Sequence, residues 1–137
     1  MGSQEDMMKG ILPGIIAGFI FLAFAGPGMN MDVGGMIGAG DTPLVGFIIH
    51  IIISAVIGAL YTGVYVGAAN FFGDNQLLTV AIGGLIYGLI WWIIGGNIIM
   101  PAISGGDILS LDFNGASLIG HIIFGHTLAW IVASHEI

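Results

Sequence analysis

Three histidines, His50, His121 and His126, lie inside long apolar segments of the sequence. An ionisable side chain is costly inside a membrane and is therefore a candidate functional residue. If the segments are helices, His50 lies about two turns from one end of its segment, and His121 and His126 lie about one and two turns from the matching end of theirs. Because His121 and His126 are five residues apart, they point about 140° away from each other, so both cannot face one ligand.

Three interpretations of these histidines are open. In the first, each imidazole bonds a backbone carbonyl, a tyrosine or a loop carboxylate and holds the helices together. In the second, His50 and either His121 or His126 are the two axial ligands of a haem b, a role suited to facing histidines in a small helical bundle. In the third, a single histidine binds a chlorophyll-type pigment or a metal ion, with Asp32 or Asp107 assisting.

Other kinds of chemistry find little support in the residue types. The sequence has no cysteine and no acidic residue in the middle of an apolar segment. It shows no nucleophile–base pair, phosphate loop or metal-ligand spacing, so we predict no catalytic residue, no metal site and no enzyme activity. Nucleic acid is excluded as a partner, because Lys and Arg together number one and phosphate binding needs clusters of them.

The amino-acid composition indicates whether water or lipid surrounds the chain. Of 137 residues, 57% are hydrophobic and only 7% are charged, whereas a soluble domain carries roughly 25% charged residues to cover its surface. A chain of this composition cannot cover a water-exposed globule, so we predict an integral membrane protein surrounded by lipid.

Four apolar segments approach the length of about 20 residues that a membrane-spanning helix needs. They cover residues 10–25, 43–67, 77–100 and 116–134. Membrane β-strands would be shorter and would alternate apolar with polar residues, which these segments do not. We expect Thr42 to cap the second helix and Pro101 to end the third. The predicted fold is all-α, with four transmembrane helices.

The second half of the sequence repeats the first. Residues 14–20 align with 84–90 at an offset of 70, and residues 44–46 align with 118–120 at an offset of 74. We therefore predict a single membrane domain, residues 1–137, made of two helix–loop–helix repeats at about 10–68 and 77–134. Each repeat crosses the membrane twice, so the two have the same (parallel) orientation.

This topology separates the charges. The two long loops share one face, and they contain Asp32, Asp41, Asp107 and Asp112. The termini and the short connection at Asp74 lie on the other face together with Lys9, the single basic residue. Positive charge favours the cytoplasmic side, so we expect both termini in the cytoplasm.

Several short motifs resemble a group of small, uncharacterised four-helix prokaryotic membrane proteins, loosely akin to the YagU inner-membrane proteins. The motifs are Met31-Asp32 with residues 36–38, residues 43–50 leading to Tyr61, and residues 99–101 and 120–125. The resemblance implies four helices in the inner (cytoplasmic) membrane of a prokaryote and draws attention to His50 and His121, but it brings no activity. The group often has Trp after the glycine that corresponds to Gly46, where this chain has Phe47.

We predict a small accessory subunit of a larger, energy-transducing membrane complex, with other membrane subunits or further copies of itself as partners. The motives are the absence of mid-span charge and the abundance of glycines that let helices pack closely. The first alternative is an electron carrier with a bis-histidine haem b or a pigment. The second is an oligomeric channel or transporter, for which Ser54, Thr62, Asn97 and Thr127 form only a sparse polar lining.

Overall fold

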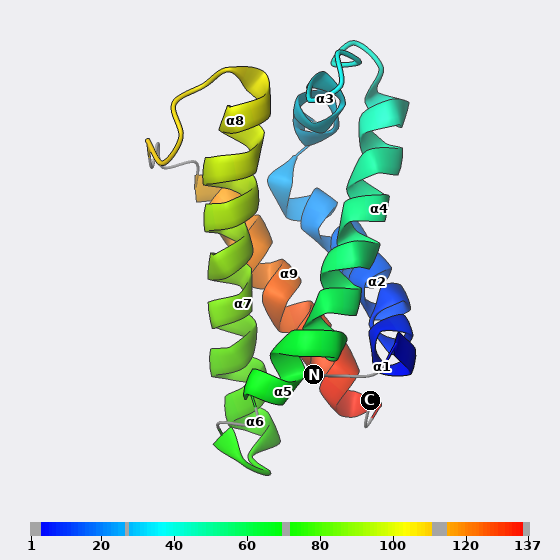
Figure 1. Cartoon of the computed structure of the whole chain (residues 1–137), viewed down its shortest axis with the longest axis vertical. Helices are drawn as coiled ribbons and strands as arrows, with labels where there is room; N and C mark the ends of the chain where they lie inside the picture. Colours follow the sequence, from blue (N-terminus) through cyan, green and yellow to red (C-terminus); the bar gives the residue numbers. More distant parts are fainter. Residues whose placement is uncertain (1–3, 27, 70–71, 111–114, 136–137) are drawn as a thin grey trace.

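The structure, a computed structural model, describes residues 4–26, 28–69, 72–110 and 115–135, and the regular secondary structure of these residues is entirely helical (Figure 1). Four helical stretches are long and apolar enough to cross a membrane, as predicted. They are Gln4–Ala25, Pro43–Tyr65, Gln76–Ser104 and Gly115–Ser134. Helices form because lipid offers no hydrogen bonds, so the backbone groups must satisfy one another within each segment. The chain is an integral membrane protein.

The first span begins earlier than the apolar pattern indicated. It consists of α1 (Gln4–Lys9) and α2 (Ile11–Ala25), joined at Gly10. The polar first turns belong to the helix, and Lys9 Nζ lies 3.6 Å from Asp6 Oδ1, one turn away. Gly26 ends the helix with a φ of 87°, a conformation that glycine adopts without strain.

The second span follows a short helix, α3 (Gly28–Gly35), and begins as α4 (Pro43–Leu60). Pro43 occupies the first turn and Thr42 the N-cap position, as expected. The expected capping bond is absent: the Thr42 hydroxyl donates to Asp41 Oδ1 at 3.4 Å instead. Beyond α4 the helix widens into the π-helical turn η1 (Tyr61–Tyr65) and ends as α5 (Val66–Ala69).

The third span alternates between α-helical and wider π-helical turns. Its segments are α6 (Gln76–Leu78), η3 (Thr79–Gly83), α7 (Gly84–Trp91), η4 (Trp92–Ile99) and α8 (Met100–Ser104). Asn75 caps its start, since Oδ1 accepts from Leu78 N at 3.1 Å. The expected end at Pro101 is wrong. Pro101 lies in the first turn of α8, where its missing N–H costs little, and the helix runs on to Ser104.

The fourth span is α9 (Gly115–Ser134), which packs against both α2 and α7. Glycines allow the closest approaches, as the small-residue spacing indicated. A Cβ on Gly58 of α4 would lie 2.6 Å from Gly14 Cα of α2, and a Cβ on Gly125 of α9 would lie 2.7 Å from Gly88 N of α7. Around these crossings the core consists of aromatic and small residues, including Ala17, Phe21, Tyr61, Tyr87, Phe124 and Leu128.

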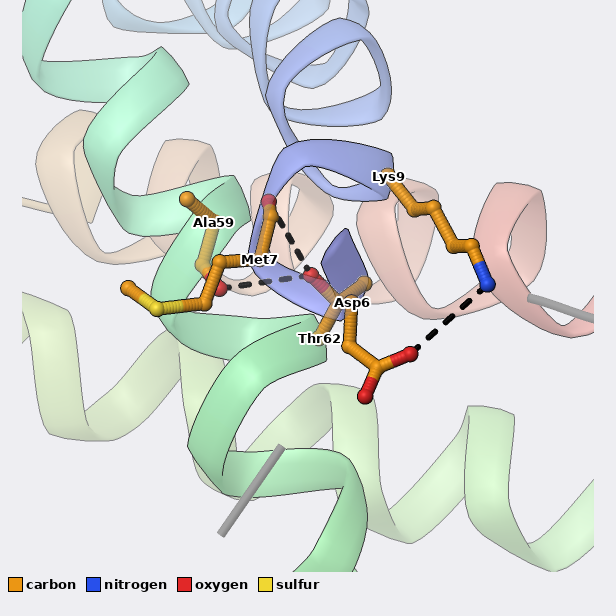
Figure 2. Close-up of polar contacts among 5 residues, drawn as sticks. All are labelled: Asp6, Met7, Lys9, Ala59 and Thr62. Atoms are coloured by element: carbon orange, nitrogen blue, oxygen red, sulfur yellow. Dashed lines mark hydrogen bonds and ion pairs between the residues drawn. The ribbon is translucent and has the colours of Figure 1, made fainter. Parts of the chain in front are cut away.

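The two ends of the bundle differ. The connections next to α3 and α8 lie at one end, and the chain termini lie at the other together with the turn between α5 and α6 (Figure 1). At the terminal end, Thr62 joins the first two spans: its hydroxyl lies 3.2 Å from Ala59 O and 3.5 Å from Met7 O. Figure 2 shows these contacts beside the Lys9–Asp6 pair. The lone lysine is therefore far from the end that carries α3.

Candidate ligand cavity

A cavity of about 510 Å³ opens between the helices, a volume in the range of small-molecule and cofactor sites. All four spans and α3 contribute to its walls. The lining includes Phe21 and Ala25 of α2, Met29, Asp32 and Val33 of α3, His50, Ser54 and Ile57 of α4, Trp91, Trp92 and Asn97 of the third span, and Ser117, His121 and Phe124 of α9. The presence of α3 places the cavity toward the end of the long connections.

His50 enters the cavity from α4 and is fixed by a neighbouring span. Its Nε2 lies 3.0 Å from Gly18 O of α2 and 3.4 Å from Ser54 Oγ. A carbonyl oxygen can only accept a hydrogen bond, so Nε2 carries the proton and Nδ1 of the neutral ring keeps its lone pair. Gly18 permits this contact, because a Cβ there would lie 2.6 Å from Ser54 Cβ.

His121 enters the same cavity from α9 in the opposite tautomer. Its Nδ1 lies 2.7 Å from Ser117 O, one turn earlier in the helix. By the same reasoning Nδ1 carries the proton and Nε2 is unprotonated. An Nδ1–H bond to a backbone carbonyl is the arrangement that orients histidines that bind through Nε2.

The two imidazoles meet at Phe21. The Phe21 ring stacks on His50 with a centroid separation of 5.3 Å and meets His121 edge-on at 4.9 Å. Both residues line the cavity, and the hydrogen bonds described above leave His50 Nδ1 and His121 Nε2 as the ring nitrogens without a proton. Two imidazoles from different spans thus contribute to one cavity.

His126, the third predicted ligand, lies elsewhere. Its Nδ1 lies 2.8 Å from Ile122 O of its own helix, and its Nε2 lies 3.0 Å from Ala81 O in η3. Both nitrogens therefore face backbone acceptors, and the residue is outside the cavity lining. This geometry is that of the first interpretation, in which a histidine joins two helices.

Sequence reasoning anticipated two parts of the site only incompletely. The first is α3: Asp32 was a candidate to assist a histidine, but the glycine-rich sequence has no apolar periodicity to indicate how the helix packs. A Cβ on Gly46 of α4 would lie 3.0 Å from Gly34 N, so the two helices touch closely. The second is η4: Asn97 was noted as a polar residue of its span, but the wide turn that brings Trp92, Gly95, Gly96 and Asn97 to the lining was not expected. π-Helical turns are frequent at functional sites. Here Asn97 Nδ2 donates to Trp92 O at 2.9 Å and stabilises the wide turn.

Among the described residues, the cavity lining has an acidic side chain but no Lys or Arg. Among the residues that the structure describes, Asp32 is the only charged residue in the lining, and Lys9, the sole Lys or Arg of the sequence, is at the opposite end. Within the described ranges, no three His, Cys, Asp or Glu side chains gather as a metal site would require. The chemistry on offer is hydrogen bonding or ligation by two imidazoles in an aromatic, weakly acidic pocket.

Comparison of the chain with known protein families, with curated proteins and with solved structures finds no match.

Proposed function

We propose that this chain is a small subunit of a larger, energy-transducing membrane assembly and that it contributes a site for a flat, lipid-soluble ligand. The observation that carries the proposal is the pair His50 and His121, which line one cavity and keep one unprotonated ring nitrogen each. His126 differs from this pair, because both of its nitrogens lie within hydrogen-bond distance of backbone carbonyls.

The exposed helix faces are compatible with neighbouring subunits as well as with lipid. Large apolar side chains are exposed on three of the spans, among them Leu12, Leu44, Ile52 and Trp130, each more than half exposed. Lipid and membrane partners both accept such faces. The inner-membrane location, both termini in the cytoplasm, and membership of the YagU-like group are parts of the same proposal.

We also propose that the two hairpins are repeats in a register set by their glycine crossings. Gly14 of α2 approaches Gly58, and Gly84 of α7 approaches Gly125. Gly58 and Gly125 are 67 positions apart. The motif alignment at the start of the same helices gives an offset of 74 instead, so the two registers differ by seven residues, or about two helical turns.

This register changes the relation between the histidines. His50 corresponds to Ser117, and Ser54 corresponds to His121, at the same spacing of 67. Each hairpin then places one histidine and one serine, four residues apart, on the cavity lining. In the motif alignment, by contrast, His50 corresponds to Phe124 and His121 corresponds to Phe47. The glycine register supports a shared site built from both repeats.

A transmembrane pore within one chain finds no support in the described residues. The half of the bundle nearest the termini is closed by Tyr61, Tyr87, Leu128 and Val132, all at most 4% exposed. The polar lining therefore stops at the cavity.

Haem b is the first ligand to test, because neutral imidazole nitrogens from two helices are suitable axial ligands. The experiment is a reduced-minus-oxidised visible spectrum of the protein purified from native membranes, with extraction and mass analysis of any bound molecule. His121→Asn retains an N–H for Ser117 O and removes Nε2. His135→Asn is the matched control, since exposed His135 makes the same bond to Ile131 O at 2.8 Å.

The steric variant Gly95→Leu tests the cavity independently of the histidines. Gly95 lines the cavity and no atom lies within 4 Å of its Cβ position, so leucine enters open space. Gly67→Leu is the matched control, because Gly67 is equally open and outside the lining. We expect a bound molecule in wild type and in Gly67→Leu and its loss in Gly95→Leu. Wild type purified without any bound molecule would contradict the proposal.

A further inference from the structure

We propose that the ligand of this cavity is an uncharged aromatic molecule with two hydroxyl groups, of the hydroquinone class. The inference rests on the proposed function, because it names the ligand of the same cavity. It is carried by three properties of the lining: its charge, the protonation of its imidazoles and its flat aromatic walls.

The charge of the cavity disfavours an anionic ligand. Asp32 supplies a carboxylate to the lining, and the chain has no arginine and only one lysine, which is paired with Asp6 at the other end. Asp32 is exposed, so it repels an anion only weakly. A carboxylate carried into the apolar interior, however, would find no basic side chain of this chain to pair with, which is strongly unfavourable. An uncharged ligand avoids this cost.

The imidazoles require hydrogen-bond donors. Nε2 of His50 is bonded to Gly18 O and Nδ1 of His121 to Ser117 O, so the nitrogens left for the ligand can only accept. A hydroquinone offers two O–H donors on opposite sides of a ring, one for each histidine. The oxidised quinone offers only acceptors: one carbonyl could accept from the buried, unpartnered Nε1–H of Trp91 in the lining, but neither carbonyl could bond an imidazole lone pair, whereas a hydroxyl group can both donate and accept. The cavity should therefore prefer the reduced form.

The walls suit a planar ring. Phe21, Trp91, Trp92 and Phe124 contribute aromatic surface from three spans, and aromatic rings favour offset-stacked or edge-on contact with another ring. Met29 and Ile57 add flexible apolar surface for ring substituents or the start of a lipid tail. The volume of about 510 Å³ accommodates a substituted ring with part of its tail.

The test measures affinity for three matched probes with the full chain in lipid nanodiscs under anaerobic conditions. The probes are decyl-ubiquinol, its quinone and its bis-methyl ether, which has the same shape but no O–H donor. Tryptophan emission reports binding in a Trp130→Phe background, because Trp91 and Trp92 line the cavity and Trp130 is 63% exposed outside it.

We expect ubiquinol to bind at least about tenfold more tightly than the quinone and the ether, as the loss of two hydrogen bonds predicts. His121→Asn and His50→Gln, which keep an N–H for the existing carbonyl partners, should weaken ubiquinol toward the affinity of the ether. His135→Asn should leave all three affinities unchanged. Gly95→Leu should abolish binding of all three probes.

Each other outcome is decisive. If all three probes bind equally, or the quinone binds most tightly, and Gly95→Leu still blocks them, the donor argument is overturned and the ligand cavity stands. If haem b added to the chain gives histidine-dependent absorption bands and ubiquinol does not compete, the hydroquinone inference is likewise overturned and the proposed function stands. If neither haem nor any probe binds, both proposals fail.

Discussion

Replacing Gly58 with alanine should destabilise the protein, although alanine favours helices. The Cβ at this position would lie 2.6 Å from Gly14 Cα and 2.9 Å from Gly14 N. These are backbone atoms, so the whole of α2 must move to relieve the overlap. An added methyl group in a closely packed site costs about 1–3 kcal/mol, which outweighs the gain of about 1 kcal/mol from replacing glycine by alanine in a helix.

The matched control is Gly67→Ala, because no atom lies within 4 Å of that Cβ position. It should keep the helix-propensity gain and be at least as stable as wild type. The assay is reversible unfolding of both variants in the same detergent, monitored by helical circular dichroism and fitted to a free energy of unfolding. If Gly58→Ala is within about 0.5 kcal/mol of Gly67→Ala, the close crossing of α2 and α4 is refuted.

Three further predictions concern hydrogen bonds and use the same unfolding assay. His126→Phe should lower the free energy of unfolding by about 1 kcal/mol, because the hydrogen bond to η3 is lost. Ligand retention should be unchanged, since His126 is outside the cavity lining, and loss of the ligand in this variant would place His126 in the site. Tyr87→Phe should cost about 0.5–1.5 kcal/mol, because its hydroxyl donates to a carbonyl of α4 at 2.6 Å, and no change would refute that bond. Asn75→Ala should lower the free energy of unfolding by about 1 kcal/mol, whereas Thr42→Ala should change it little, because of the two residues only Asn75 makes a side-chain capping bond. Equal losses of stability in the two variants would contradict the capping geometry.

The four spans could be predicted because they follow from length and composition alone. An apolar stretch of about 20 residues has one low-energy form in lipid, which is the helix. The ends were less predictable. Pro101 was expected to end the third span, yet the wide turns of η4 before it let a new α-helical turn begin at Met100. Sequence spacing does not reveal where a helix changes from α to π geometry.

The candidate site was predictable in part. The positions of His50 and His121 along their helices indicated that they lie at similar depth, and the structure brings both to one cavity. Which histidine accompanies His50 depended on helix rotation and register. The sequence motifs and the glycine contacts give different repeat registers, because the motifs lie at the helix starts whereas Gly58 and Gly125 lie where the helices meet.

The α3 wall of the cavity was predicted only in part, since Asp32 was already a candidate to assist a histidine ligand. The glycine-rich sequence has low intrinsic helix propensity, and the segment is held by its close contact with α4 at Gly46. Such a segment takes its conformation from tertiary packing, so composition does not reveal where its helix begins and ends.

The most direct test of the central claim, that the cavity between His50 and His121 holds a ligand, is native mass spectrometry of the protein gently extracted from its own membrane. Wild type and Gly67→Leu should each show the chain with one additional small molecule bound. Gly95→Leu, which adds a side chain to the lining of the cavity, should show only the mass of the chain. A wild-type spectrum without a bound molecule, or one in which Gly95→Leu retains it, would contradict the account.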